Sequence, residues 1–212
     1  IRAGINTTFQ DEGRDNLYHI GIPFSGAMDI RNFYLANKLV NNILNAPIIE
    51  FAYQGPHIKF TGDKLNIAVT GDVIFKIIKN GMEIDGNCYE SYQIENGDEI
   101  NIISTNKSVY GYLSIGADID INYQWKSCSI NTRAKIGSND GNKLSEGQKF
   151  SLLNLNTNYN KKKINYINTK IESLRIIKGT NYDYFSQEGI QNFFGKQFIV
   201  SKLSDRMGVR LE

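Results

Sequence analysis

A series of short, β-branched segments between residues 47 and 115 constrains the fold more than any other feature of the sequence. Turns containing Gly, Pro, Asn or Asp separate the segments, and Asn80-Gly81 is the dipeptide most typical of a two-residue β-hairpin turn. Many short strands at regular spacing are typical of an all-β barrel or sandwich. The expected strands are Ile48–Tyr53, Ile58–Phe60, Leu65–Thr70, Val73–Lys79, Cys88–Ile94, Glu99–Ser104 and Val109–Ile115.

A helix is expected before this series and irregular chain after it. Asp29 is predicted to be the N-cap of a helix over residues 30–42, because apolar residues recur there at helical spacing. Residues 116–168 are rich in Asn, Ser and Lys, so we expect few regular elements in them.

The last part of the chain is expected to return to β structure at Ile171–Lys178, with a short helix over Tyr182–Phe194 and a strand at Phe198–Ser201. We therefore predict an N-terminal β domain over residues 1–160 and the start of a second domain over residues 161–212.

Composition argues against several classes of protein. The 24 Lys and Arg residues against 22 Asp and Glu residues leave a net charge of +2, which gives no argument for a nucleic-acid partner. The cluster Lys161-Lys162-Lys163 is interpreted as part of a solvated loop. No apolar run approaches the ~20 residues of a membrane span. Cys88 and Cys128 form no CxxC motif, so we expect the protein to lie in the reducing cytoplasm. We also expect no metal site built from His or Cys.

A dense polar segment over residues 5–29 is the first candidate for function, because polar loops carry function more often than cores do. Gln10, Asp11 and Arg14 lie within five residues of one another. An arginine fork can donate to a planar polar ligand, and a carboxylate can accept from it. The alternative is a salt-bridged loop that only fixes its own turn.

Two further turns combine polar residues with possible anion sites. Ser25-Gly26-Ala27-Met28-Asp29 leads into the predicted helix, whose free N–H groups attract carboxylate or phosphate; simple capping by Asp29 is the alternative. Near the end of the chain, Ser204, Asp205, Arg206 and Arg210 can clamp an anion or pair across a turn. The chain contains no P-loop motif.

Two long motifs, one near each end of the chain, resemble the biotin-dependent carboxyltransferase-like family. Its members include the C subunit of 5-oxoprolinase, the Kip-type antagonist of a kinase inhibitor and allophanate hydrolase subunit 2-like proteins. The residues that carry the resemblance are Thr7–Arg14, Gly21–Asp29, Ala36–Asn42, Glu50, Gly55-Pro56 and Val200–Leu211.

The resemblance implies a mainly β fold of cyclophilin-like β-barrel architecture with a few short helices and an incomplete C-terminal domain. It also implies membership of a complex, with A-like and B-like partner subunits, that opens the lactam 5-oxoproline to glutamate using ATP shared within the complex. Regulation of a histidine-kinase inhibitor, and carboxyl transfer from carboxybiotin, are the alternatives. Biotin is not expected to be attached here, because Asp29 stands where the attachment lysine would be needed.

The site residues that follow from the motifs fall into two groups. We predict catalytic roles for Gln10, Asp11, Arg14, Asp205 and Arg206. We predict substrate binding by Ser25, Gly26, Ala27, Asp29, Asn37, Ser204 and Arg210.

The sequence also departs from the family pattern. Trp125-Lys126-Ser127-Cys128-Ser129 stands where the family has a Gly-Ser-Arg-Ser-Thr-like stretch, and Gly179-Thr180-Asn181 stands in place of Gly-Pro-Gln. These differences fall in the middle of the expected site, where they bear most directly on the activity.

Overall fold

The structure, a computed structural model, describes residues 1–165, 173–202, 204–206 and 208–212. By its internal contacts the chain divides into two units, residues 1–166 and 167–212, so the division falls six residues after the predicted domain boundary. The two units are described separately.

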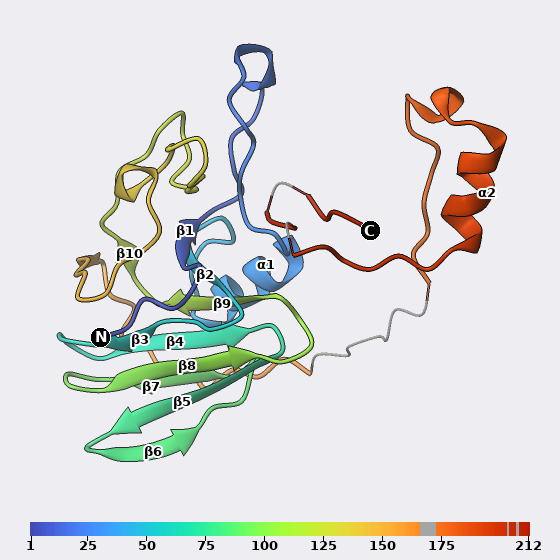
Figure 1. Ribbon diagram of the computed structural model, residues 1–212. Coiled ribbons are helices and arrows are strands. Elements are labelled where there is room, and N and C mark those ends of the chain that lie inside the picture. The colour runs from blue at the N-terminus through green and yellow to red at the C-terminus, as the bar shows by residue number, and fades with distance from the viewer. Residues whose placement is uncertain (166–172, 203, 207) are drawn as a thin grey trace. The chain divides into compact units, whose positions relative to one another are not determined.

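The first unit is built from two antiparallel sheets (Figure 1). The larger sheet has the order β1-β2-β9-β4-β7 and the smaller sheet the order β3-β8-β5-β6; β10 and β11 form a separate pair. The strands are β1 (Thr8–Gln10), β2 (Ile48–Ala52), β3 (His57–Lys59), β4 (Leu65–Thr70), β5 (Val73–Lys79), β6 (Met82–Asp85), β7 (Ser91–Ile94), β8 (Glu99–Thr105), β9 (Tyr110–Ile115), β10 (Asp118–Ile119) and β11 (Leu152–Leu153).

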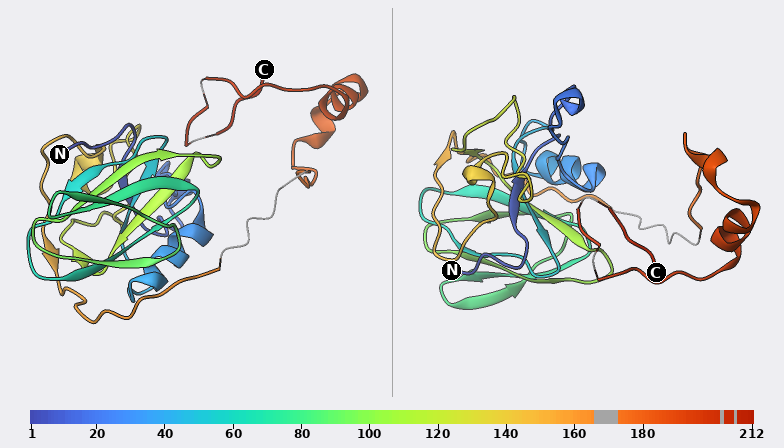
Figure 2. Two further views of the ribbon diagram at one scale, coloured as in Figure 1. Left: turned by 90° about the horizontal axis from the view of Figure 1, so that it is seen from below. Right: turned by 45° about the horizontal axis from the view of Figure 1, so that its top comes forward.

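The main core lies between the two sheets (Figure 2). Alternate residues of the longer strands point into it, because side chains of a strand alternate between the faces of its sheet. Ile67 and Val69 of β4 belong to this core, whereas Ala68 packs with Leu39 on the other face. The helix α1 (Ile30–Leu39) covers that other face, so every residue of β4 is buried.

Most of the predicted elements are confirmed. β4 and β5 have the predicted bounds, and Asn80-Gly81 joins β5 to β6 with positive φ at both residues. The helix begins at Ile30, as predicted, and ends three residues early at Leu39. The mainly β fold is confirmed, but the described strands form open sheets, so the barrel is not.

The second unit contains a 3-10 helix, η3 (Tyr182–Tyr184), and the helix α2 (Gln187–Gly195). The predicted single helix is broken between them because Ser186 leaves the helical region and caps α2, accepting a hydrogen bond from the Gly189 N–H at 3.0 Å. The strand predicted at Phe198–Ser201 appears as a β-bridge between Val200 and Leu211.

One strand prediction for this unit is wrong. Of Ile171–Lys178, residues 171 and 172 lie outside the described part of the chain, and residues 173–178 contain no strand. None of the buried hydrophobic side chains lies in the described part of this unit. A strand there has no apolar surface to cover, so the local β propensity of the sequence is not realised.

Residues 156–164 form a strap that lies along the edge of the larger sheet. The Ser91 N–H donates to the Lys162 carbonyl, and the Ile164 N–H donates to the Tyr89 carbonyl, both at 2.9 Å. The exposed Lys161 and Lys163 pair with the buried Glu90, at 3.4 and 2.8 Å. Lys161 and Lys163 are therefore not only part of a solvated loop. Their ion pairs with Glu90 hold the strap on the sheet.

Glu90→Gln is expected to loosen this strap in a pH-dependent way. Hydrogen bonds and charges of Lys163, with a further contribution from Lys161, lower the pKa of Glu90. The carboxylate therefore stabilises the fold above its ordinary pKa of about 4.3, and this contribution is lost as pH falls through the lowered value. Near pH 7 we expect the substitution to cost less than about 1 kcal/mol, because both lysines are exposed.

Chemical denaturation between pH 7 and pH 3 tests this expectation, with Glu83→Gln as the control because Glu83 pairs with Lys76 of β5 from the exposed strand β6. A stability difference between the parent chain and the Glu90→Gln variant that persists unchanged to pH 3 would contradict it.

Candidate functional site

Asp11 is the centre of a buried polar cluster just after β1. Its carboxylate accepts hydrogen bonds from the hydroxyls of Ser127 and Ser129, at 2.6 and 2.5 Å, and from the N–H groups of Cys128 and Gly13, at 2.7 and 2.9 Å. The Asp11 N–H in turn donates to the Ser129 hydroxyl at 2.9 Å. The carboxylate therefore joins the polar segment near the N-terminus to a segment more than a hundred residues away in the sequence.

Arg14 lies beside this cluster and is 1% exposed. Its Nε donates to the Gln124 carbonyl at 3.2 Å and its Nη2 to the Ser127 carbonyl at 3.4 Å. Burial lowers the pKa of Arg14, and the negative charge of Asp11 opposes that shift. Its Nη1 is buried and has no hydrogen-bond partner among the described residues.

Gln10 is fully buried on the same part of the chain. Its Nε2 donates to the Thr8 hydroxyl at 2.8 Å and to the Ile130 carbonyl at 2.9 Å, while its Oε1 has no partner among the described residues. Gln10, Asp11 and Arg14 thus all bind the segment 124–130. Most of their hydrogen-bonding groups are used inside the protein, as in the self-bracing alternative, but their catalytic roles stay predictions.

Two other titratable groups border the carboxylate. Burial and the nearby Asp11 raise the pKa of the Cys128 thiol, so this buried cysteine stays protonated. Burial, with contributions from Cys128 and Asp11, raises the pKa of Tyr123 to about 12. Neither group supplies a base near neutral pH.

The Ser25–Asp29 corner packs against the same cluster. The Ala27 N–H donates to the Asp11 carbonyl at 2.9 Å, and the Ser25 hydroxyl accepts from Asn131 at 3.4 Å. Gly26 has φ of 85°, and a Cβ there would lie 2.6 Å from the Glu12 carbonyl oxygen. The structure therefore brings the predicted residues of the Ser25–Asp29 corner to the cluster around Asp11.

The start of α1 is capped from within the protein. The Asp29 carboxylate accepts from the Asn32 N–H at 3.0 Å and from the Asn32 side chain at 2.7 Å. The Met28 N–H donates to Glu50 at 2.8 Å, and the Asp29 N–H donates to the Tyr112 hydroxyl at 2.6 Å. These bonds engage the N–H groups of Met28, Asp29 and Asn32, so capping is the better interpretation of this corner.

Asn37 is likewise engaged within the protein. Its amide donates to the carbonyls of Leu44 and Ala46, at 3.0 and 2.8 Å, and its oxygen accepts from the Ser114 hydroxyl at 2.7 Å. These bonds fix the end of α1 against the sheet. Substrate binding by Asn37 stays a prediction, and every group of its amide already has a partner.

The predicted residues near the end of the chain lie in a hairpin of the second unit. They are Ser204, Asp205, Arg206 and Arg210. The Ser204 hydroxyl bonds to both the N–H and the carbonyl of Arg210, at 2.8 and 3.2 Å, and the backbones of Asp205 and Gly208 are paired. Arg206 lies in the turn of this hairpin. Ser204 and Arg210 are thus brought together, and the roles of these four residues stay predictions.

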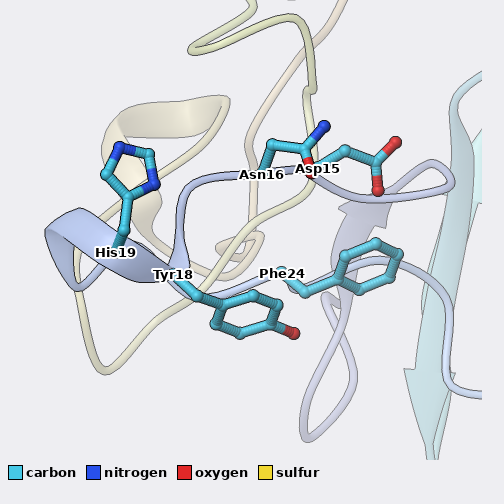
Figure 3. Close-up of a pocket in the computed structure, with 5 residues that line it drawn as sticks. All are labelled: Asp15, Asn16, Tyr18, His19 and Phe24. Atoms are coloured by element: carbon cyan, nitrogen blue, oxygen red, sulfur yellow. The ribbon is translucent and has the colours of Figure 1, made fainter.

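A shallow pocket lies beyond the Asp11 cluster, in the loop of residues 14–24 (Figure 3). The loop projects from the sheets and carries the 3-10 helix η1 (Tyr18–Ile20) (Figure 1). The pocket combines a carboxylate, an amide, an imidazole and two aromatic rings, which are groups able to hold a small planar amide. Its lining residues are Asp15, Asn16, Tyr18, His19 and Phe24.

The predicted site omitted these pocket residues, and it omitted three of the four partners of the Asp11 carboxylate, namely Ser127, Cys128 and Ser129. The position of Ser127–Ser129, where the family has a polar stretch of its own, was the one available signal for them. The described residues contain no group of three or more His, Cys, Asp or Glu side chains arranged to bind a metal. No helix in the same part of the chain is long and apolar enough to span a membrane.

Asp11→Asn is expected to lower the free energy of unfolding by roughly 2–4 kcal/mol, because the amide removes the charge and leaves at least one buried donor without an acceptor. The exposed Asp120→Asn is the matched control, with an expected change within about 0.5 kcal/mol. Urea unfolding of both variants tests the expectation, and equal stabilities would show that the cluster does not brace the fold.

Gly26→Ala is expected to destabilise the protein more than Gly21→Ala. Both glycines have positive φ, which costs an L-residue roughly 1–2 kcal/mol, but only Gly26 faces a backbone oxygen at 2.6 Å. A Cβ at Gly21 would meet nothing within 4 Å. Thermal unfolding of the two variants measures the difference; a larger loss at Gly21 would contradict the close approach of the corner to Glu12.

Comparison with known proteins places this arrangement in a family. The family described as carboxyltransferase domain, subdomain A and B, matches residues 20–212. Urea amidolyase of Saccharomyces cerevisiae is 30% identical over 224 residues, covering 98% of this chain and 12% of that protein. The C subunit of 5-oxoprolinase from Haemophilus influenzae is 27% identical over 205 residues, covering 97% of this chain and 65% of that protein.

A solved structure gives the same result. The crystal structure of Kluyveromyces lactis urea carboxylase superposes with a TM-score of 0.80 at 27% identity, covering 100% of this chain and 20% of that one. The chain therefore spans about two thirds of one relative and small parts of the others. With a family match over most of its length, the chain belongs to the carboxyltransferase domain family, subdomains A and B.

Proposed function

We propose that this chain is the amide-handling subunit of an ATP-dependent amidohydrolase-type complex resembling 5-oxoprolinase. The observation that carries the proposal is the match to the C subunit of 5-oxoprolinase, which extends over 97% of this chain and 65% of that protein. The substrate we propose is the lactam 5-oxoproline, and the proposed partners are A-like and B-like subunits of the same complex.

The geometry of the chain supports separate roles for the pocket and for the buried cluster within this proposal. The pocket of residues 14–24 offers Asn16 to pair with the amide of the substrate and the rings of Tyr18 and Phe24 to stack on its plane. His19 and Asp15 supply further polar contacts. Asp11 and Arg14 hold the base of this loop, so we propose that they position the pocket and do not contact the lactam.

ATP would supply the energy by activating the lactam oxygen through phosphorylation. At the corner before α1, the N–H groups of Ala27, Met28 and Asp29 already have acceptors within the protein, so they are not free to bind a phosphate. We therefore propose that the partner subunits bind the nucleotide and that this chain supplies substrate contacts only.

The test is glutamate release from 5-oxoproline by the chain assembled with its A-like and B-like partners. We expect ATP-dependent release, and we expect Asn16→Ala and His19→Ala to reduce it by roughly tenfold or more, since each removes a polar group proposed to contact the substrate. The exposed Asn45→Ala, which lies outside the pocket, is the control and should retain full activity. A folded, complete complex without turnover would overturn the proposal.

Carboxyl transfer is the second candidate, favoured by the structural match to urea carboxylase at a TM-score of 0.80. In this case the same pocket would hold an acceptor amide while a carboxyl group arrives on biotin carried by another domain or protein. Incorporation of labelled bicarbonate into urea, measured with a biotin carboxylase and a biotinylated carrier added, distinguishes it from ATP-dependent lactam opening.

Tight binding to a kinase-inhibitor-like protein without turnover would favour the regulatory alternative.

A further inference from the structure

The core between the two sheets of the first unit opens to the surface beside β3. A groove of about 960 Å³ lies there, within the range of roughly 300–1,000 Å³ that is typical of small-molecule sites. The groove reaches into the core itself, because six of its lining residues are buried members of that core. They are Phe60, Ile67, Ile94, Ile100, Ile115 and Leu144.

The mouth of the groove leaves apolar surface uncovered. Five lining side chains pack against the core but are only partly buried. They come from the start of the chain, from β3 and from residues 150–155, and they are Ala3, Ile58, Phe150, Leu152 and Leu155. Apolar surface that is gathered in a concave site and rimmed by polar residues is typical of a ligand-binding site.

The chemistry of the lining changes from the floor of the groove to its rim. Every buried lining residue is apolar, and every polar lining residue is exposed or half-buried. The apolar lining is mostly aliphatic, with Phe60 and Phe150 as its aromatic members. A polar heterocycle would lose its hydrogen bonds to water on such a floor, whereas an alkyl chain would lose none. The floor therefore suits an aliphatic chain.

The rim carries mainly positive charge. Three of the four Asp, Glu, Lys and Arg side chains in the lining are cationic, namely Arg2, Lys59 and Lys149, and Asp63 is the acidic one. Lys59 lies 3.7 Å from Glu99, which also pairs with the half-buried His57 at 2.8 Å. Arg2 and Lys149 have no ion pair with an acidic side chain in the described part of the chain, so they remain available to an anion.

Arg2 also has a buried donor that the protein leaves unused. Its Nη2 donates to the Asn101 side chain at 3.0 Å and to the Ile102 carbonyl at 2.9 Å. Its Nε is buried and has no hydrogen-bond partner among the described residues. An unsatisfied buried donor is costly, and a carboxylate is the acceptor that a guanidinium binds best. The unused Nε therefore points to a carboxylate ligand.

We propose that this groove binds a free medium-chain aliphatic carboxylate. The alkyl chain covers the open end of the core, and the carboxylate meets Arg2 and Lys149 at the rim. The groove shares no lining residue with the pocket of residues 14–24, so this inference does not rest on the proposed function.

Isothermal titration calorimetry of the full chain with decanoate, below the concentration at which decanoate forms micelles, tests the proposal. We expect octanoate to bind roughly 15-fold more weakly than decanoate, which corresponds to about fourfold for each buried CH₂ group. Decanol should bind at least roughly tenfold more weakly than decanoate, because it lacks the charge that pairs with Arg2. Decyltrimethylammonium should not bind, since its headgroup has the charge of the rim.

Variants assign the binding to the groove. Arg2→Met keeps an apolar stem and should weaken decanoate binding by roughly tenfold or more, with little change for decanol. Lys149→Glu changes an exposed residue, so it should leave the fold intact and weaken decanoate binding if Arg2→Met fails to fold. Leu155→Trp fills the groove and should weaken binding of both ligands. The exposed Lys107→Glu, outside the groove, is the control and should leave binding unchanged.

Several results would overturn the proposal. No heat of binding with decanoate would do so, as would equal affinities for decanoate and decanol. Binding that survives both Lys149→Glu and Leu155→Trp would show that the ligand lies elsewhere. Self-association of the chain that Leu155→Trp abolishes would show that a second copy fills the groove. Sedimentation with phosphatidylglycerol vesicles, without binding of free decanoate, would show that the groove takes a membrane lipid instead.

Discussion

The buried carboxylate of Asp11 is the interaction on which the arrangement of the site depends. Two hydroxyls and two backbone N–H groups donate to it, which satisfies a charge that would be costly to bury alone. Three of these donors come from Ser127–Ser129, so a single side chain fixes the polar segment near the N-terminus against the irregular part of the chain. Arg14 adds two bonds to the same region and sets the base of the projecting loop.

The layered core makes such a fixed loop possible. The larger sheet is covered on one face by the smaller sheet and on the other by α1, so β2, β4 and most of β9 are buried throughout. A sheet buried on both faces has little freedom to deform. Because β1 pairs with β2 in this sheet, the position of Asp11, which follows β1, is fixed by the sheet as well as by its own hydrogen bonds.

This division between a rigid base and an exposed loop shapes the functional proposal. The cluster of Asp11, Arg14 and Gln10 has most of its hydrogen bonds within the protein, whereas the pocket of residues 14–24 has polar groups open to a ligand or partner. This arrangement supports the proposed assembly, in which another protein would provide the nucleotide chemistry. At the predicted anion site at the helix start, capping is the better interpretation, because Asp29, Glu50 and Tyr112 already accept hydrogen bonds from N–H groups there.

Local pattern in the sequence was enough to predict α1 and most of the longer strands of the first unit, but not β1 or β6. β-Branched runs predicted β4 and β5 with their observed bounds, Asn80-Gly81 predicted the hairpin, and Asp29 predicted the start of α1. These features depend on neighbours within a few residues, which the sequence displays directly. The family motifs also placed Gln10, Asp11 and Arg14 in one polar site.

Only the tertiary structure decided what those residues contact. Asp11 and its partner Ser129 are separated by 118 positions, and Glu90 and its partner Lys163 lie in segments that no local period connects. Of the strand expected at Ile171–Lys178, the described residues 173–178 form none, because β propensity needs an apolar surface to pack on. The sequence therefore determined most of the short elements of the first unit and which polar residues near the N-terminus enter the cluster. Long-range packing decided which of those residues are hydrogen-bonded within the protein. It also decided that the exposed polar groups of the pocket lie on the projecting loop of residues 14–24.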